Sequence, residues 1–362
     1  KADGSNFARP LFIWRFNMKT KLIPFTKDMI SEAGALLARR HQRNRKTLPF
    51  LTGRFEKKEI SEKAINLLFE KKNSSGYAAI RNGKMVAYFL GRMTIQPWGR
   101  CGWVSLPGSA LAEGESVETL QDLYVLLGDD WVKRGVFIHH TYLSVADKDL
   151  INAWFNLDFG KERIDAILDL KQIEIPDIKV PSGIQIRRAK DGDNQHLASM
   201  SHLIMRELEK APYWHPTPPE DFSELREGWA ELASDETVNT WLALEGGKAI
   251  GTIASWETMH PEGETDIDMH TAENTFSLSV AATTPEARGR GIMTALTWTC
   301  LEHNLNQGFK YCFTDWISPN LAASRFWPRF GYKEVSYRLT KNINPMISWT
   351  RKAQGKASCD KE

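Results

Sequence analysis

Residues 285–296 read PEARGRGIMTAL, a proline followed by a basic, glycine-rich turn and the start of an apolar stripe. The stripe continues through Ile292, Leu296 and Cys300, which is helical spacing. The preceding residues, 275–283 (TFSLSVAAT), are apolar and predict a strand. The glycine-rich turn is therefore expected where a strand passes into a helix.

Such a turn suits an anion. A helix N-terminus carries unsatisfied N–H groups and roughly half a positive charge. Gly289 and Gly291 allow the backbone to approach an oxygen closely, and Arg288 and Arg290 add charge. The stretch predicts a pyrophosphate-binding turn, although neither G-x-x-x-x-G-K-[ST] nor a complete G-x-G-x-x-G is present. A basic surface loop is the alternative interpretation.

The chain also repeats itself. YAAIRNGKMVAYF, from Tyr77, and WLALEGGKAIGTI, from Trp241, both read as a strand, a two-residue turn and a second strand. A second repeat has the same spacing of apolar residues and a glycine in each copy: Leu150, Phe155, Phe159 and Gly160, then Leu321, Phe326, Phe330 and Gly331. Two repeated patterns in the same order predict duplicated domains, at 18–172 and 182–349, with a proline-containing linker at 171–183.

The second copy predicts an α/β arrangement with a mixed sheet. The expected elements, in order, are a strand at 184–189, helices within 196–208 and 223–233, a hairpin at 240–256, the strand at 275–283, a helix from 292 to about 307, a strand at 310–316, a helix from 320 and a final strand from 333. Residues 1–17 and 350–362 are expected to be tails.

Length and composition limit the function classes. The 362 residues are ample for two domains, and a net charge of +2 gives no global field that favours nucleic acid or a membrane surface. The four cysteines form neither a C-x-x-C pair nor a regular framework, which is typical of reduced thiols. No apolar run approaches the ~18 residues that span a bilayer. We expect a cytoplasmic protein without nucleic-acid or membrane partners, for which a homodimer is allowed.

The turn and its surroundings resemble the GCN5-related N-acetyltransferases, or GNAT enzymes. Their signature, Q/R-x-x-G-x-G/A, is matched by residues 288–293 (RGRGIM) after Pro285, with Met293 at the usual Gly/Ala position. Residues 320–332 (NLAASRFWPRFGY) resemble the family's second cofactor-binding element. The resemblance spans 184–340 and implies two tandem GNAT-like domains, each a mixed, mostly antiparallel central sheet flanked by helices.

For the second copy the resemblance implies acetyl-CoA as co-substrate, bound in a V-shaped cleft between strands 275–283 and 310–316. The implied cofactor-binding residues are Ala281, Ala282 and Thr283 for the pantetheine arm, Arg288, Gly289, Arg290, Gly291, Ile292, Met293 and Thr294 for the pyrophosphate, and Asn320. The alternative role of Asn320 is a helix N-cap. The first copy has no arginine at the corresponding place (103–120) and carries Glu113 and Glu115 there. It is expected to be non-catalytic.

The catalytic groups are less well defined. Glu257, His270 and Asp315 are our candidates for the base that takes the amine proton. Glu257 and His270 lie at the two ends of an acidic segment. The other residues of this segment, which are further base candidates or simply parts of a solvated loop, are His260, Glu262, Glu264, Asp266 and Asp268. No metal is expected, because cysteine and compact histidine spacing are lacking.

Trp327 stands where many family members have a tyrosine acid, and an indole cannot fill that role. Tyr332 and Tyr337 lie near it in sequence, and the thiolate can also leave unprotonated because a free thiol has a pKa of only ~8.5. The aromatic loop 211–222, with Tyr213, Trp214 and His215, falls where the family places its acceptor lid. A packed core segment or a proline-stiffened surface loop is the alternative interpretation.

The sequence thus predicts an N-acetyltransferase that moves an acetyl group from acetyl-CoA to an amine of a small-molecule acceptor. Two alternatives stay open: an acyl-CoA-binding sensor or pseudoenzyme, and a protein N-acetyltransferase that docks its target on the first domain.

Overall fold

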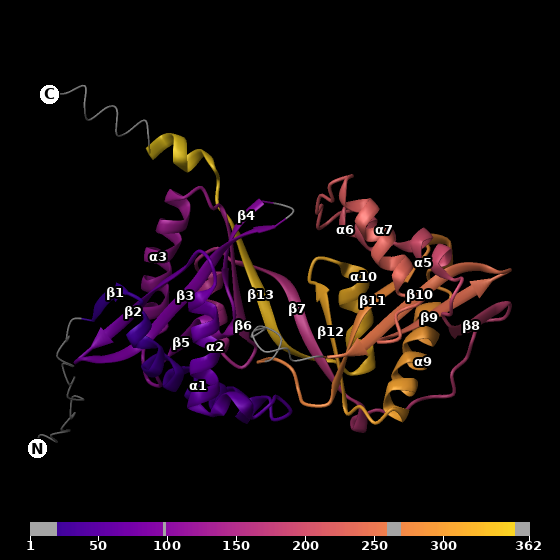
Figure 1. Ribbon diagram of the computed structural model, residues 1–362, viewed down its shortest axis with the longest axis horizontal. Helices are drawn as coiled ribbons and strands as arrows, with labels where there is room; N and C mark the ends of the chain where they lie inside the picture. The colour runs from indigo at the N-terminus through magenta and orange to yellow at the C-terminus, as the bar shows by residue number, and fades with distance from the viewer. Residues whose placement is uncertain (1–19, 97–98, 259–268, 352–362) are drawn as a thin grey trace, which may run out of the picture.

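The computed structural model describes residues 20–96, 99–258 and 269–351. The predicted tail at 1–17 lies outside these ranges, as does most of 350–362. Within the described residues, one mixed sheet runs through both halves of the chain (Figure 1). Its strand order is β1-β2-β3-β4-β6-β13-β7-β12-β11-β10-β9-β8, with β5 paired to β3.

The first half contains eleven of the described helices and strands: β1 (Lys21–Pro24), α1 (Ile30–Thr47), α2 (Lys58–Glu70), β2 (Ser74–Arg81), β3 (Lys84–Gln96), β4 (Gly99–Val104), β5 (Ser109–Leu111), α3 (Glu118–Lys133), β6 (Ile138–Ser144), α4 (Lys148–Phe155) and β7 (Gly160–Asp169). Only β4 and β6 pair in parallel here, and the other described pairs are antiparallel. The tight turn at Asn82-Gly83 joins β2 and β3, with φ values of 53° and 74°, as a type I′ hairpin requires.

The second half repeats this plan in β8 (Ile184–Arg188), α5 (Asn194–Met200), α6 (Leu203–Leu208), α7 (Asp221–Glu231), β9 (Val238–Glu245), β10 (Lys248–Glu257), β11 (Thr275–Thr283), α9 (Ile292–Asn306), β12 (Tyr311–Ile317), α10 (Leu321–Phe326) and β13 (Lys333–Asn342). These bounds lie within a few residues of the predicted ones, and β11 coincides with its prediction. The expected fold class, an α/β arrangement with a mixed sheet flanked by helices, is confirmed.

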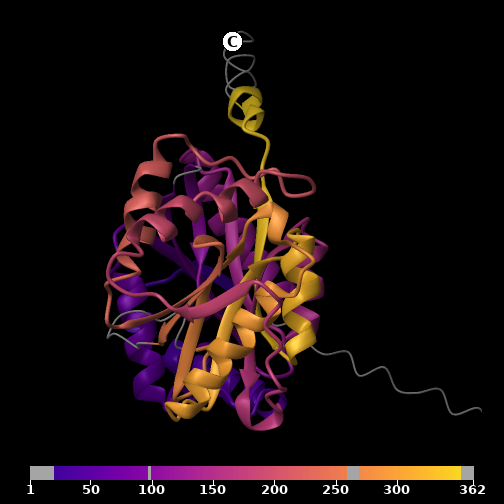
Figure 2. The same ribbon diagram turned by 90° about the vertical axis from the view of Figure 1, so that its right-hand side faces the viewer.

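Strand alternation divides the second half into two layers. In β9, Leu242 and Leu244 pack with α5 and α7, whereas Ala243 packs with α9 on the opposite face. This period of two is what buries both faces of a strand under helices. Figure 2 views this half, with α9 and α10 on one side of the sheet and α5 to α7 on the other.

The two halves exchange their last strands. β7, the final strand of the first half, pairs with β12 of the second half, and β13 returns to pair with β6 of the first. β7 and β13 also pair with each other, side by side at the centre of the sheet (Figure 1). The predicted boundaries, 18–172 and 182–349, therefore divide the chain but do not divide the sheet.

Candidate active site

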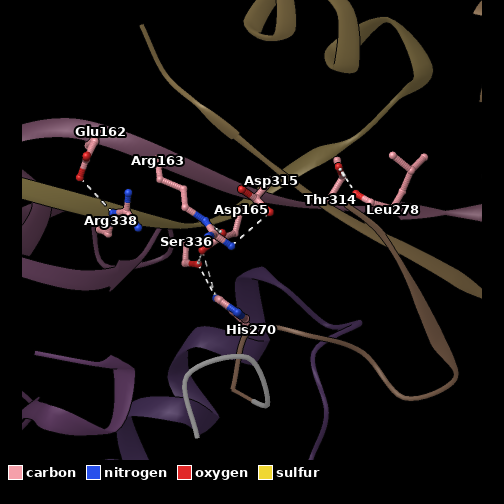
Figure 3. Close-up of polar contacts among 9 residues, drawn as sticks. All are labelled: Glu162, Arg163, Asp165, His270, Leu278, Thr314, Asp315, Ser336 and Arg338. Carbon is pink, nitrogen blue, oxygen red and sulfur yellow. Dashed lines mark hydrogen bonds and ion pairs between the residues drawn. The ribbon is translucent and has the colours of Figure 1, made fainter. Parts of the chain in front are cut away.

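A cleft forms where β11 and β12 separate. These strands pair in parallel from Thr275 and Tyr311 as far as Leu278 and Thr314, and both continue beyond that point unpaired with each other. The Thr314 hydroxyl donates to the Leu278 carbonyl at 2.8 Å, which closes the inner end of the opening (Figure 3). On the other edge of β11, Ser279 is the extra residue of a β-bulge, and a bulge bends its strand.

This cofactor cleft, as we call it, has a volume of about 630 Å³, within the range of ligand-binding pockets. With one exception, the residues implied for cofactor binding line it: Ala281, Ala282, Thr283, Arg288, Gly289, Gly291, Ile292, Met293, Thr294 and Asn320. The exception is Arg290. Residues that are far apart in the sequence thus line one cavity.

The glycine-rich turn opens α9 at the mouth of the cleft. Gly289 and Gly291 have φ values of 74° and 80°, a left-handed conformation that other residues adopt only with strain. Gly291 is the N-cap of α9, and its carbonyl accepts from the Ala295 N–H. The N–H groups of residues 292–294 come before that first helical bond, so they remain available to an anion in the cleft.

The two arginines of the turn have different partners. The Arg288 guanidinium donates to Glu207 of α6 at 2.9 Å, and both side chains line the cleft. Burial opposes ionisation of Glu207, but the bonds from Lys210 and Arg288 hold its pKa below the usual value. Arg290 instead forms two bonds with Glu245, at 2.6 and 3.0 Å. Because the β9–β10 hairpin brings Glu245 to the turn, the Arg290 side chain is paired there and is not among the residues that line the cleft. Its role toward the pyrophosphate stays a prediction.

Asn320 is a helix N-cap, as in the alternative interpretation. Its side chain accepts from the Ala323 N–H at 3.3 Å at the start of α10. It also lines the cofactor cleft, so a role toward the cofactor stays a prediction.

The three candidate bases lie in different surroundings. Asp315 lines the cleft immediately beyond the last β11–β12 pair. Glu257 is exposed at the end of β10, opposite Phe276, and is not part of the cleft lining. His270 is buried and also outside the lining. The other acidic-segment candidates, His260, Glu262, Glu264, Asp266 and Asp268, lie outside the described residues.

Asp315 belongs to a polar network that crosses the exchanged strands (Figure 3). Arg163 of β7 contacts Asp315 at 3.2 Å and Asp165 at 2.8 Å. The Ser336 hydroxyl of β13 donates to Asp165 at 2.7 Å. Its oxygen is then free to accept from the Nδ1–H of His270, at 2.6 Å. Among the described residues, His270 is therefore connected to Asp315 through Ser336, Asp165 and Arg163.

Burial raises the pKa of Asp315 above the usual carboxyl value, and the nearby Arg163 guanidinium offsets only part of this effect. Asp165 differs, because the attraction of Arg163 and His270 outweighs its complete burial and holds its pKa well below the ordinary value. A carboxylate with a raised pKa that opens into a cleft is suited to accept a proton.

The candidate acids do not point into the cleft. The Tyr332 hydroxyl lies 3.0 Å from the Cys312 sulfur in the core, and the Tyr337 hydroxyl donates to Glu334. Trp327, by contrast, lines the cleft. In the loop expected to be a lid, Tyr213 donates to Glu162 of β7 at 2.8 Å, stacking on His215, whereas Trp214 is exposed.

The first half has the corresponding strand but fills the corresponding space. Residues 109–111 pair with 87–89 of β3 in the way that 281–283 pair with 251–253 of β10. The buried Arg40 of α1 donates to the carbonyls of Leu106 (2.8 Å) and Ser109, and Arg43 donates to that of Leu111 (3.0 Å). The backbone groups that the second half leaves facing its cleft are here bonded to the protein itself.

Sequence reasoning missed the wall of the cleft that α6 provides and the charges beneath Asp315. Glu207 showed no local signal, because its partner Arg288 is distant in sequence. Arg163 and Asp165 belong to the half expected to be inert, and only the strand exchange brings them to the site. The described residues contain no cluster of three or more His, Cys, Asp or Glu side chains placed to hold a metal ion. Nor do they include a helix long and apolar enough to cross a membrane.

Comparisons with known proteins agree with this geometry. Residues 199–332 match the model of the Acetyltransferase (GNAT) family. No protein of curated function matches the chain. Among solved structures, a GCN5-related N-acetyltransferase from Sphaerobacter thermophilus is similar with a TM-score of 0.56 at 15% identity, over 90% of this chain and 96% of that one.

Two further structures are similar in fold. One is a GCN5-related glucosamine N-acetyltransferase region of a fungal multi-domain GH3 beta-N-acetylglucosaminidase, with a TM-score of 0.54 at 18% identity over 89% of this chain and 38% of that one. The other is a tandem GNAT protein from the clavulanic acid biosynthesis pathway, with a TM-score of 0.50 at 12% identity over 90% and 99%. Residues 199–332 therefore form a domain of the Acetyltransferase (GNAT) family, and the fold of the chain as a whole is similar to those of GNAT proteins.

Proposed function

We propose that this protein is an acetyl-CoA-dependent N-acetyltransferase that acts on an amine of a small-molecule acceptor, with its active site in the second half. The observation that carries the proposal is the continuity of the cofactor cleft. One cavity extends from the separated ends of β11 and β12 to the glycine-rich start of α9.

The two ends of the cleft suit the two parts of the cofactor. None of the described strands lies beside the β11 backbone at Ala281 and Thr283 on the cleft side, so it can pair with the amide-bearing pantetheine arm as with an added strand. The N–H groups at the start of α9 and the Arg288 guanidinium suit the pyrophosphate. Arg288 would exchange its bond to Glu207 for one to the ligand.

Asp315 is the chain's own group for the proton. In the reaction, the amine nitrogen bonds to the thioester carbon, the carbon–sulfur bond breaks and the sulfur takes the electron pair. The ammonium proton passes to Asp315, directly or through water. Of the three candidate bases, Asp315 alone lines the cleft, and burial raises the pKa of its carboxyl group.

The leaving thiolate needs no dedicated acid. Trp327 lines the cleft where a proton donor would stand and cannot supply a proton, whereas a free thiol with a pKa of ~8.5 can leave as the anion. The same feature favours the sensor hypothesis, in which the protein binds the thioester without turning it over.

Calorimetric titration with acetyl-CoA, followed by a free-thiol assay against a panel of amines, tests the proposal. One site per chain with amine-dependent thiol release is the expected result. Acetyl-CoA binding without thiol release in the presence of any small amine or amine-bearing peptide would instead establish a sensor. Release with peptides alone would favour the protein-modifying alternative. Absence of binding would overturn the cofactor cleft itself.

A further inference from the structure

The strand exchange places two charged residues of the first half beneath the proposed proton acceptor. In the β7–β12 register, Asp165 lies directly opposite Asp315. Directly opposed residues of an antiparallel pair have Cβ atoms about 5 Å apart, close enough for two carboxylates to repel each other strongly. The Arg163 guanidinium lies between them, 2.8 Å from Asp165 and 3.2 Å from Asp315.

The Asp165 end of this bridge is fixed by further polar contacts. Asp165 is completely buried and has Arg163, Ser336 and His270 as polar partners. Asp315 keeps 29% of its side-chain surface exposed, toward the cleft. One end of the network is thus sealed and anionic, and the other opens where the substrates would meet.

We infer that Arg163 and Asp165 are positioning residues, supplied by the first half, which orient the Asp315 carboxylate toward the cleft and set the pH at which it ionises. The catalytic meaning of this inference rests on the proposed function. It assigns the first half a part in the reaction although that half lacks a phosphate-binding turn.

Besides Arg163 and Asp165, the charged groups that act on Asp315 are Arg338 and His270, and Arg329 lines the same cleft. Arg338 of β13 donates to Glu162 at 3.0 Å, and Glu207 of α6 is paired with Arg288 and Lys210. His270, from the segment before β11, is held by Ser336 and Asp165. Arg163 and Asp165 are therefore the groups whose removal should change the charge on Asp315 most directly, and they should change it in opposite directions.

The test is to titrate the Asp315 carboxyl by NMR in protein labelled with carbon-13 at the Asp carboxyl groups, its signal assigned by its loss in Asp315→Asn. Arg163→Met leaves two opposed carboxylates, so the pKa of Asp315 should rise by about one to three units. Arg163→Lys keeps the charge and should restore most of the wild-type value. Asp165→Asn removes the repelling carboxylate, so the pKa of Asp315 should fall.

The same variants are then assayed for acetyl transfer across pH. Asp315 accepts a proton only when ionised, so the acidic limb of kcat/KM should shift with its pKa, upward in Arg163→Met and downward in Asp165→Asn. A merely structural role would lower activity without these opposite shifts.

The inference is overturned if the Asp315 titration is the same in Arg163→Met and wild type, or if both substitutions move it in one direction. If Arg163→Met proves unfolded by circular dichroism, Arg163→Lys and Asp165→Asn still decide the matter, since a pKa that does not fall in Asp165→Asn contradicts it. Opposite NMR shifts in a protein that releases no thiol with any amine would leave the charge coupling established and the proposed function wrong. Opposite NMR shifts with an unmoved pH profile would show that Asp315 is not the base, and would overturn the catalytic part of the inference.

Discussion

The two halves of the molecule share one folding plan and differ where a ligand would bind. In the second half, 281–283 continue a bulged strand beside an open cleft and lead into the glycine-rich turn. In the first half, 109–111 pair in the same way, but Arg40 and Arg43 of α1 bond to their carbonyls or to those close by. Glu115, in the segment before α3, pairs with Arg81 at 2.6 Å instead of facing a phosphate.

The difference lies in what satisfies the carbonyl groups of corresponding strands in the two halves. A carbonyl that faces an empty cleft is hydrogen-bonded to water until a ligand binds, whereas a carbonyl bonded to a buried guanidinium contributes to stability. In the first half, the carbonyls of Leu106, Ser109 and Leu111 are bonded to arginines of α1. Its exchanged strand nevertheless places Arg163 and Asp165 beside Asp315 of the second half.

The largest contrast concerns the residue just past the last parallel pair, which is Asp315 in the second half and Tyr142 in the first. Asp315→Asn keeps the shape and can still accept from Arg163 but cannot take a proton. We expect kcat to fall by about 10²- to 10⁴-fold, with acetyl-CoA affinity retained in calorimetry. A fall of less than threefold would remove Asp315 from the mechanism.

Arg40→Met tests the self-satisfied half. It leaves the carbonyls of Leu106 and Ser109 buried without their donor, so the free energy of unfolding should fall by about 3 kcal/mol. Urea denaturation followed by circular dichroism measures the loss. The exposed Arg39 on the same helix provides the control, because Arg39→Met should change little. Equal stability of the two variants would contradict the structural role given to Arg40.

Arg288→Ala tests the turn that only the second half has. Its guanidinium lies in the cleft, so losing one charged contact at about 1.5–3 kcal/mol should weaken acetyl-CoA binding by roughly 10- to 150-fold. Calorimetry measures the change. Pantetheine serves as the control, since this fragment lacks the pyrophosphate and should bind both proteins alike.

The smallest effect is expected from Arg290→Ala, in the same turn. This exposed side chain is paired with Glu245 outside the cleft, so acetyl-CoA affinity should change by less than about threefold, as is usual for surface ion pairs. Comparison with Arg288→Ala under the same conditions separates a general charge effect from a specific contact. An equal loss in both would mean that overall positive charge, and not the cleft geometry, binds the phosphates.

Much of the fold could be predicted because its signals are local. The hairpin turns at 82–83 and 246–247 depend on residues that tolerate positive φ, and the β11–α9 junction depends on Pro285, Gly289 and Gly291. The apolar stripe that begins at Ile292 also lies within a single helix. Interactions of this kind act between residues close in sequence, and so the two hairpins and the junction before α9 could be located without a structure.

The sequence by itself determined the two hairpins and the strand–turn–helix junction, and it indicated most of the candidate residues that line the cleft. Only the tertiary structure decided that β7 pairs with β12 and β13 with β6, and that this pairing brings Arg163 and Asp165 next to Asp315. It also decided that Arg290 pairs with Glu245 and that Arg40 bonds to the carbonyls of Leu106 and Ser109. The physical reason is the range of each interaction. Backbone conformation follows neighbouring residues, whereas strand pairing and buried charge depend on which distant segments meet.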